Sequence, residues 1–255
     1  MSELLEVNHV SYAYHSIDGE TETLADISFH IKEGEFAAIV GPSGCGKSTL
    51  LSLICGLLKP EKGEILLDGK SIAGEKERIG YMLQKDYLFE WRSIYSNVML
   101  GLEIQKKKSE KYTKRVDQML KDYGLWDFRD VRPSQLSGGM RQRAALIRTL
   151  ALQPELLLLD EPFSALDYQT RLSVCEDIYR IIKKEQKTAV LVTHDLSEAI
   201  SMADRIFVLS KRPAEIKKEI KLDFNMKERT PMQVRNAPQF RDYFNLIWKE
   251  LNHDV

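Results

Sequence analysis

The chain has 255 residues, 43% of them hydrophobic, which is enough for one large domain or two modest ones. Its 37 basic and 38 acidic side chains nearly cancel, which argues against general nucleic-acid binding, because that affinity depends mainly on neutralising phosphates. No apolar run approaches the ~18 residues that span a bilayer, the first ten residues do not read as a secretory signal, and three cysteines make no disulfide framework, so a reduced cytosolic protein is the default expectation.

Short apolar runs alternate with helical patterns along the chain, which favours an α/β fold with a largely parallel sheet. Several runs are continuously apolar, as expected for strands that are buried on both faces. In chain order, strands are expected at 35–40, 64–67, 78–83, 156–160, 189–193 and 206–209. Helices are expected at 47–58, 109–123, 168–184 and 196–202.

The strand signal disappears between about residues 87 and 148, which predicts a helical insertion. The chain then ends in a charged strand-like run at 215–224, a proline-flanked linker and an amphipathic helix. The apolar residues of this helix recur at helical spacing and are Phe240, Tyr243, Phe244, Ile247, Trp248 and Leu251. Such a stripe predicts a helix packed on its own domain.

The stretch 41–49 reads GPSGCGKST, which fits the pattern G-x-x-x-x-G-K-[ST] between a predicted strand and a predicted helix. Its glycines allow successive backbone N–H groups to point at an anion, and the helix adds its positive N-terminal end. Lys47 supplies a cation for the β- and γ-phosphates, Ser48 offers a hydroxyl to Mg²⁺, and Cys45 is interpreted as a small loop residue rather than a redox thiol. The expected nucleotide contacts here are Gly41, Pro42, Ser43, Gly44, Cys45, Gly46, Lys47, Ser48 and Thr49.

A second candidate site follows the apolar run 156–159, which ends in Asp160 and Glu161. A carboxylate at the C-terminal end of a strand, beside a phosphate loop, can hold Mg²⁺ through its water shell. The adjacent Glu161 could orient and deprotonate an attacking water. The pair therefore predicts nucleotide hydrolysis rather than binding alone.

With these residues in place, the chain resembles the ATP-binding subunit of an ABC transporter. Residues 136–140, LSGGM, resemble the family signature LSGGQ, with Met140 where glutamine is usual. Residues 164–167 match the D-loop, Gln84 matches the Q-loop glutamine, and His194 matches the switch histidine. Tyr14 is placed like the aromatic residue that stacks on adenine, although Tyr12 on the same strand face is an alternative.

The resemblance implies a P-loop NTPase (RecA-like) core with a mainly parallel sheet, an N-terminal antiparallel β region and an inserted helical subdomain. Residues 1–255 would form one ABC ATPase domain, with the core at 1–86 and 149–212, the helical subdomain at 87–148 and a tail at 213–255. The resemblance also implies ATP and Mg²⁺ as cofactors. The implied catalytic residues are Lys47, Gln84, Glu161 and His194, and the implied metal site is Ser48, Gln84 and Asp160.

The implied assembly is a homodimer closed around two ATP molecules, in which Ser137, Gly138 and Gly139 of each chain face the phosphate loop of the other. The sequence 90–92, Glu-Trp-Arg, and the stretch LSGGMRQR resemble the nitrate, sulfonate and taurine-type importers. This implies a peripheral protein on the cytoplasmic face of the membrane. Its partners would be permease subunits, and indirectly an extracytoplasmic substrate-binding protein. The permease would dock near Phe89, Glu90, Trp91 and Arg92.

Several alternatives stay open from the sequence. The transported solute could be nitrate, a sulfonate, taurine, bicarbonate or a thiamine-precursor pyrimidine. The chain could also serve an exporter or a lipoprotein-release system, or act as a soluble ABC ATPase outside transport. A DNA-repair or chromosome ATPase is disfavoured because residues 84–136 lack sustained heptads. Trp91 could alternatively pack between the core and the helical insertion.

Overall fold

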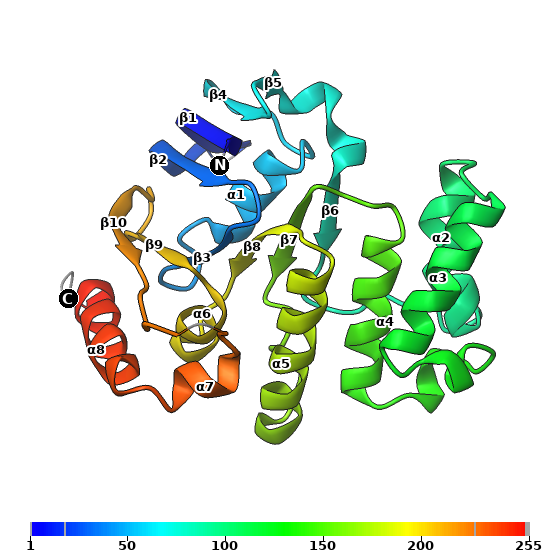
Figure 1. Ribbon diagram of the computed structural model, residues 1–255. Helices are drawn as coiled ribbons and strands as arrows, with labels where there is room; N and C mark the ends of the chain where they lie inside the picture. Colours follow the sequence, from blue (N-terminus) through cyan, green and yellow to red (C-terminus); the bar gives the residue numbers. More distant parts are fainter. Residues whose placement is uncertain (1, 18, 227, 253–255) are drawn as a thin grey trace.

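Six strands form a sheet whose two faces are both covered by other parts of the chain (Figure 1). The structure is a computed structural model, which describes residues 2–17, 19–226 and 228–252; the outer limits 1 and 255 of the predicted domain lie outside these ranges. The sheet order is β10-β9-β3-β8-β7-β6, parallel except for β10 at the edge. Its strands are β3 (Phe36–Val40), β6 (Ile79–Met82), β7 (Leu156–Asp160), β8 (Thr188–Val192), β9 (Arg205–Leu209) and β10 (Ile216–Lys221).

A second sheet of four strands lies above the first and is antiparallel in order β2-β1-β4-β5. It contains β1 (Glu3–Ser16), β2 (Gly19–Lys32), β4 (Lys62–Leu67) and β5 (Lys70–Ser71). The two sheets meet where the backbones of Thr23 and Ala25 bond Ala214. The predicted fold class, a parallel P-loop core with an N-terminal antiparallel region, is confirmed.

Helix α1 (Lys47–Ile54) lies between the two sheets, and the other helices cover the opposite face of the six-stranded sheet or extend beyond it. Helices α2 (Ile94–Ile104), α3 (Glu110–Asp122) and α4 (Gly138–Leu150) form the insertion between β6 and β7. The remaining helices are α5 (Tyr168–Lys184), α6 (Leu196–Met202), α7 (Pro231–Arg235) and α8 (Pro238–Asn252). Among the described residues, none of these helices has the length and apolar character needed to cross a membrane.

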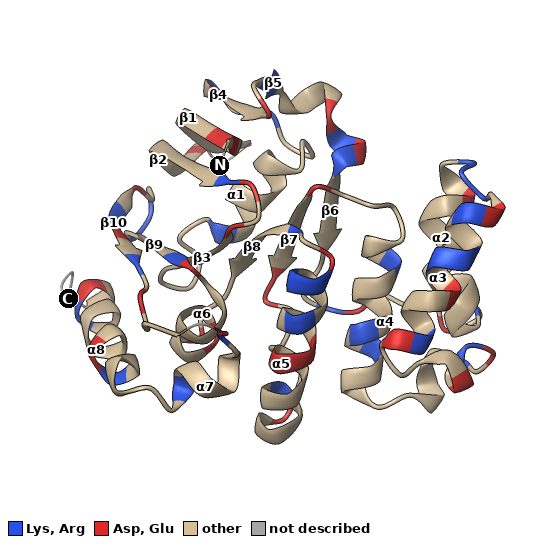
Figure 2. Cartoon of the chain, viewed as in Figure 1, with Lys and Arg blue, Asp and Glu red and all other residues tan. Residues whose placement is uncertain are grey.

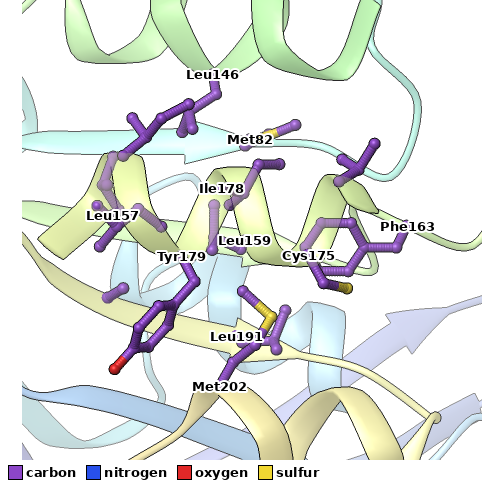
Figure 3. Close-up of a cluster of buried hydrophobic side chains, with 14 of the residues drawn as sticks. Met82, Leu146, Leu157, Leu159, Phe163, Cys175, Ile178, Tyr179, Leu191 and Met202 are labelled. Carbon is purple, nitrogen blue, oxygen red and sulfur yellow. The ribbon is translucent and has the colours of Figure 1, made fainter. Parts of the chain in front are cut away.

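Adjacent residues of the parallel strands belong to two different hydrophobic cores. On β7, Leu157 and Leu159 pack with the helical layer, whereas Leu156 and Leu158 pack with α1 and the antiparallel sheet. Figure 3 shows part of the first core, where the side chains of Met82, Leu159, Leu191 and Ile178 lie close together among the strands and α5. This two-sided burial explains the continuously apolar runs in the sequence.

Some predicted bounds change in the structure. Helix α1 ends at Ile54 rather than 58, because Gly56 takes a left-handed φ of 70° and reverses the chain. The strand expected at 215–224 is limited to Ile216–Lys221. Helix α2 lies within the predicted helical insertion, but its bounds were not predicted. Helix α4 continues past residue 148, the predicted end of the helical subdomain, to Leu150.

The terminal helix α8 packs on its own domain, as predicted. Ile247 is fully buried, and the stripe residues Phe240, Tyr243, Phe244 and Leu251 contact the helical-side core. Trp248 departs from the prediction, with 57% of its surface exposed. Figure 2 shows acidic and basic residues interspersed on α3, α5 and α8, consistent with the near-neutral net charge.

Candidate functional site

The loop between β3 and α1 wraps around the Lys47 ammonium group. Lys47 Nζ donates to the carbonyl oxygens of Gly41 and Pro42, both at 2.9 Å, and the side chain is almost fully buried. Gly46 has a φ of 120°, and a Cβ there would lie 2.8 Å from Leu24 Cδ2. Only glycine therefore fits this position, where β2 supports the loop from behind.

A cavity of about 520 Å³ opens in front of this loop. Its lining residues are Ser43, Gly44, Gly46, Lys47, Ser48, Thr49, Glu161, His194 and Arg212. Arg212 was missed in the sequence, and its Nη2 donates to the Gly44 carbonyl oxygen at 2.6 Å. Only the strand order, which sets β9 beside β3, brings this arginine to the loop that follows β3.

Ser48 and Asp160 form a compact group of oxygen atoms at the edge of the cavity. The Ser48 hydroxyl donates to Asp160 Oδ1 at 3.2 Å, and the Tyr81 hydroxyl donates to Asp160 Oδ2 at 3.1 Å. Burial raises the pKa of Asp160, and the two hydrogen bonds partly oppose that rise. A hydroxyl beside a carboxylate suits a hard divalent cation, which would also compensate the buried negative charge. Tyr81 has no sequence motif to reveal it.

Glu161 brings three of the predicted catalytic side chains together. Its Oε2 lies 3.1 Å from His194 Nδ1 and accepts from Gln84 Nε2 at 3.4 Å. The Gln84 amide also donates to the Ser164 hydroxyl at 3.2 Å. Glu161 has a φ of 44°, a left-handed backbone conformation that is strained for a non-glycine residue. This conformation is held by hydrogen bonds from Glu161 N to Val192 O and from Ser164 Oγ to Glu161 O.

The two candidate adenine-stacking residues have different environments. Tyr14 is 46% exposed, and its hydroxyl lies 3.2 Å from Thr49 Oγ1 in the phosphate loop. Tyr12 packs against the core between the sheets and meets the Tyr14 ring edge-on, at a centroid distance of 5.0 Å. Tyr14 is therefore the more exposed of the two rings, and it contacts Thr49, which lines the cavity.

The signature residues lie at the start of α4 and do not line the phosphate cavity of their own chain. Ser137 caps the helix by accepting from Met140 N at 3.3 Å. A Cβ at Gly138 would lie 2.8 Å from Leu166 Cδ2, and one at Gly139 would lie 2.7 Å from Val174 Cγ2. Met140, at the position where the family has glutamine, packs its side chain against the core.

The sulfur of Cys45 faces inward. The residue is buried, and burial raises the pKa of its thiol. A raised pKa disfavours the thiolate, which agrees with the interpretation of Cys45 as a small loop residue.

The segment 89–92 presents an aromatic pair at the surface. Trp91 is 71% exposed and stacks on Phe89 at a centroid distance of 4.7 Å. The alternative in which Trp91 packs between the core and the helical insertion is therefore wrong; Leu88 is the residue of this stretch that is buried. Glu90 accepts from Ser134 N at 3.1 Å, and Arg92 pairs with Glu103 at 2.5 Å.

The match to known proteins extends over most of the chain. The family model of ABC transporters matches residues 24–164. The uncharacterized ABC transporter ATP-binding protein YtlC of Bacillus subtilis (strain 168) is 49% identical over 248 residues, which cover 97% of this chain and 95% of YtlC. The taurine import ATP-binding protein TauB of Roseobacter denitrificans is 37% identical over 251 residues, which cover 96% of this chain and 94% of TauB.

Solved structures agree with this assignment. The ATP-binding cassette MJ0796, in a dimeric post-hydrolysis state bound to ADP and Pi, has a TM-score of 0.73 and 32% identity. The match covers 86% of this chain and 99% of that chain. With a family match over more than half of its length, and the phosphate loop, Asp160 and Glu161 gathered around one cavity, this chain belongs to the ABC transporter family.

Proposed function

We propose that this chain is the ATP-hydrolysing subunit of an importer, which binds MgATP, dimerises around two ATP molecules and drives a membrane permease. The observation that carries the proposal is the cluster around Glu161. Gln84 and His194 both contact its carboxylate, and that carboxylate and His194 line the same cavity as Lys47. This is an arrangement for cleaving a bound phosphate chain rather than only holding it.

Each residue has a role that follows from its contacts. Lys47 would exchange its two carbonyl acceptors for phosphate oxygens, and the backbone N–H groups of residues 42–49 would cradle the rest. Glu161 would orient and deprotonate the attacking water, His194 would contact the γ-phosphate, and Gln84 would sense Mg²⁺ and the γ-phosphate. Ser48 and Asp160, which share a hydrogen bond, would hold Mg²⁺ together with Gln84, and the ion would neutralise charge on the phosphates. Tyr14 would stack on the adenine.

A single chain contains only part of the site. Ser137 and the N–H groups of Gly138 and Gly139 form a second anion-binding helix start, which does not line the phosphate cavity of the same chain. In a homodimer these groups would complete the partner's site at the γ-phosphate. The MJ0796 cassette, which is dimeric and bound to ADP and Pi, supports dimerisation.

The exposed aromatic pair Phe89–Trp91 is the proposed docking point for a cytoplasmic helix of the permease. Asn97 holds this loop: its Oδ1 accepts from Phe89 N at 2.7 Å, and its Nδ2 donates to Phe89 O at 3.0 Å and Arg92 O at 3.2 Å. Asn97 is fully buried, whereas the rings of Phe89 and Trp91 are exposed. A loop held in this way is suited to present the two rings to a partner without rearrangement. Glu90 and Arg92 stabilise the loop from within the subdomain and are not free rim charges.

Import is favoured over export because the named relatives include taurine import proteins, aligned over nearly their whole length. The proposed solute is of the nitrate, sulfonate and taurine class or a related small solute, because the named relatives include taurine import proteins. The proposed location is the cytoplasmic face of the membrane, through the permease, with an extracytoplasmic binding protein as the indirect partner.

The test is to extract the chain from its native membrane in mild detergent and to identify the proteins that accompany it. Co-purification of a permease whose complex hydrolyses MgATP, and whose ATPase rate rises with a loaded extracytoplasmic binding protein, supports the proposal. A complex with a permease that no binding protein stimulates indicates export. A chain that hydrolyses MgATP without any membrane partner contradicts the transport function.

A further inference from the structure

The Arg171 side chain, in the first turn of α5, joins two separate segments of the candidate site. Its Nη2 donates to the Leu166 carbonyl oxygen at 3.0 Å, and its Nη1 donates to Asp195 Oδ2 at 3.3 Å. Its Nε lies 3.9 Å from Glu198 Oε1, and about three quarters of the side chain is buried. One guanidinium group therefore holds residues on both sides of it with a fixed geometry.

On one side, Arg171 holds the segment that carries His194. Asp195 uses Oδ1 to cap α6, accepting from Ser197 N at 2.7 Å, which leaves Oδ2 for the arginine. The backbone N–H of Asp195 donates to Thr193 Oγ1 at 3.0 Å. Both neighbours of His194 are thus anchored, which limits where its imidazole can point.

On the other side, Arg171 holds Leu166, the residue that contacts the signature helix. The Leu166 side chain lies 2.8 Å from the point where a Cβ on Gly138 would be, so it packs directly on that glycine. A shift of the Leu166 backbone would therefore move against the start of α4. The two segments joined by Arg171 carry the group that binds the γ-phosphate and the surface that supports the signature.

We propose that Arg171 is a positioning residue for ATP hydrolysis, which fixes the His194 segment and the Leu166 segment relative to each other. The inference rests on the proposed function of this site, because it assigns Arg171 a role in the hydrolysis that His194 and Glu161 perform. A residue that merely joined α5 to α6 would affect stability. A positioning residue affects turnover while nucleotide affinity stays nearly constant.

The variants Arg171→Ala and Arg171→Lys are compared with Arg180→Ala. Arg180 lies on the same helix, is mostly exposed and pairs with Glu176 within the helix, so it is a matched control. We expect kcat to fall by about ten- to a hundredfold in Arg171→Ala, with KM changed by less than about threefold, since small misplacements cost this much. Arg171→Lys keeps the charge but lacks the planar set of guanidinium donors that binds two acceptors at once, so its turnover is expected to fall as well. A kcat of either variant within about twofold of the Arg180→Ala value overturns the inference.

A double-mutant cycle and a spectroscopic measurement separate positioning from simple destabilisation. Asp195→Asn keeps the helix cap but removes the charged partner, so adding Arg171→Ala to it should cost little further turnover. Losses that multiply in the double variant contradict the coupling. The imidazole NMR resonance of His194, assigned by its absence in His194→Gln, should shift in Arg171→Ala and stay in place in Arg180→Ala. An unmoved resonance contradicts the positioning.

Different results would contradict the proposed function and the role of Arg171. If the wild type and Arg180→Ala do not hydrolyse MgATP, the proposed function is wrong, and the His194 resonance alone decides whether Arg171 positions that residue. If both hydrolyse MgATP and Arg171→Ala does so equally well, only the role of Arg171 is wrong.

Discussion

The carboxylate of Glu161 and the imidazole of His194 lie 3.1 Å apart, at the ends of the adjacent strands β7 and β8. Glu161→Gln keeps the shape and one acceptor but removes the proposed base. It should still bind MgATP and lose hydrolysis by about two or more orders of magnitude. Equilibrium binding and steady-state turnover measure the two effects separately. Lys47→Ala, by contrast, should weaken nucleotide binding. Near-normal turnover in Glu161→Gln would overturn the assignment of Glu161 as the general base.

The Glu161→Gln variant should also form a stable dimer with ATP. The γ-phosphate would join the phosphate loop of one chain to Ser137 of the other, and without hydrolysis that contact persists. Nucleotide can shift the monomer–dimer equilibrium only by its higher affinity for the dimer. Sedimentation velocity with ATP and with ADP is the measurement. Equal dimer populations in the two nucleotides contradict an interface that senses the γ-phosphate.

Tyr14→Ala should weaken ATP binding by roughly 1–3 kcal/mol, the usual contribution of an aromatic ring stacked on a base. Tyr14→Phe should bind nearly normally, because it keeps the ring and loses only the hydroxyl contact with Thr49. Isothermal titration of MgATP into the three forms checks this. If Tyr12→Ala shows the loss instead, the assignment to Tyr14 is incorrect.

Trp91→Ala separates docking from folding. Because Trp91 is largely exposed, its removal should change the melting temperature by less than about 2 °C and leave basal hydrolysis intact. Co-purification with the permease and transport should both fail. Leu88→Ala is the contrasting variant, since Leu88 is buried in the core and its loss should lower the melting temperature clearly. A Trp91→Ala protein that assembles normally contradicts the docking role.

Glu198 predicts a pH dependence of stability. Burial raises its pKa from 4.5 to about 7; Asp195 acts in the same direction, while the Thr193 hydrogen bond, Arg171 and His194 act against it. The folded state therefore binds this proton more tightly than the unfolded state. The resulting stabilisation is complete below pH 4.5 and is lost as the pH rises through about 7.

Glu198→Gln removes this titration while keeping an acceptor for the Thr193 hydroxyl. The variant should match the wild type in urea unfolding near pH 4.5 and exceed it by up to about 3 kcal/mol near pH 8.5. A difference that is the same at both pH values contradicts the raised pKa.

The sequence predicted an element most accurately where its residue pattern is compatible with a single structure. The limits of α5, α6 and β7 were predicted correctly, because continuous burial or a capped amphipathic pattern leaves few other choices. The strands of the antiparallel sheet were less visible: β1 and β2 were expected only from the family resemblance. Some contacts between distant segments were not predictable: Tyr81 on Asp160 and Arg212 on Gly44 depend on the strand order. The hydrogen bonds of Asn97 to the loop 89–92 are local and depend on the geometry of that loop.

The alternation of Leu156 to Leu159 between two cores has a mechanical consequence for the carboxylates that follow them. Both faces of strand β7 are closely packed, and Asp160 and Glu161 lie at its C-terminal end. A tilt or a shift of the strand would therefore open a void in one of the two cores. The two carboxylates thus depend on the packing of both hydrophobic cores, one on each face of the sheet. A large-to-small substitution in either core, even far from the nucleotide, should therefore lower the rate of hydrolysis at temperatures where the protein is still folded.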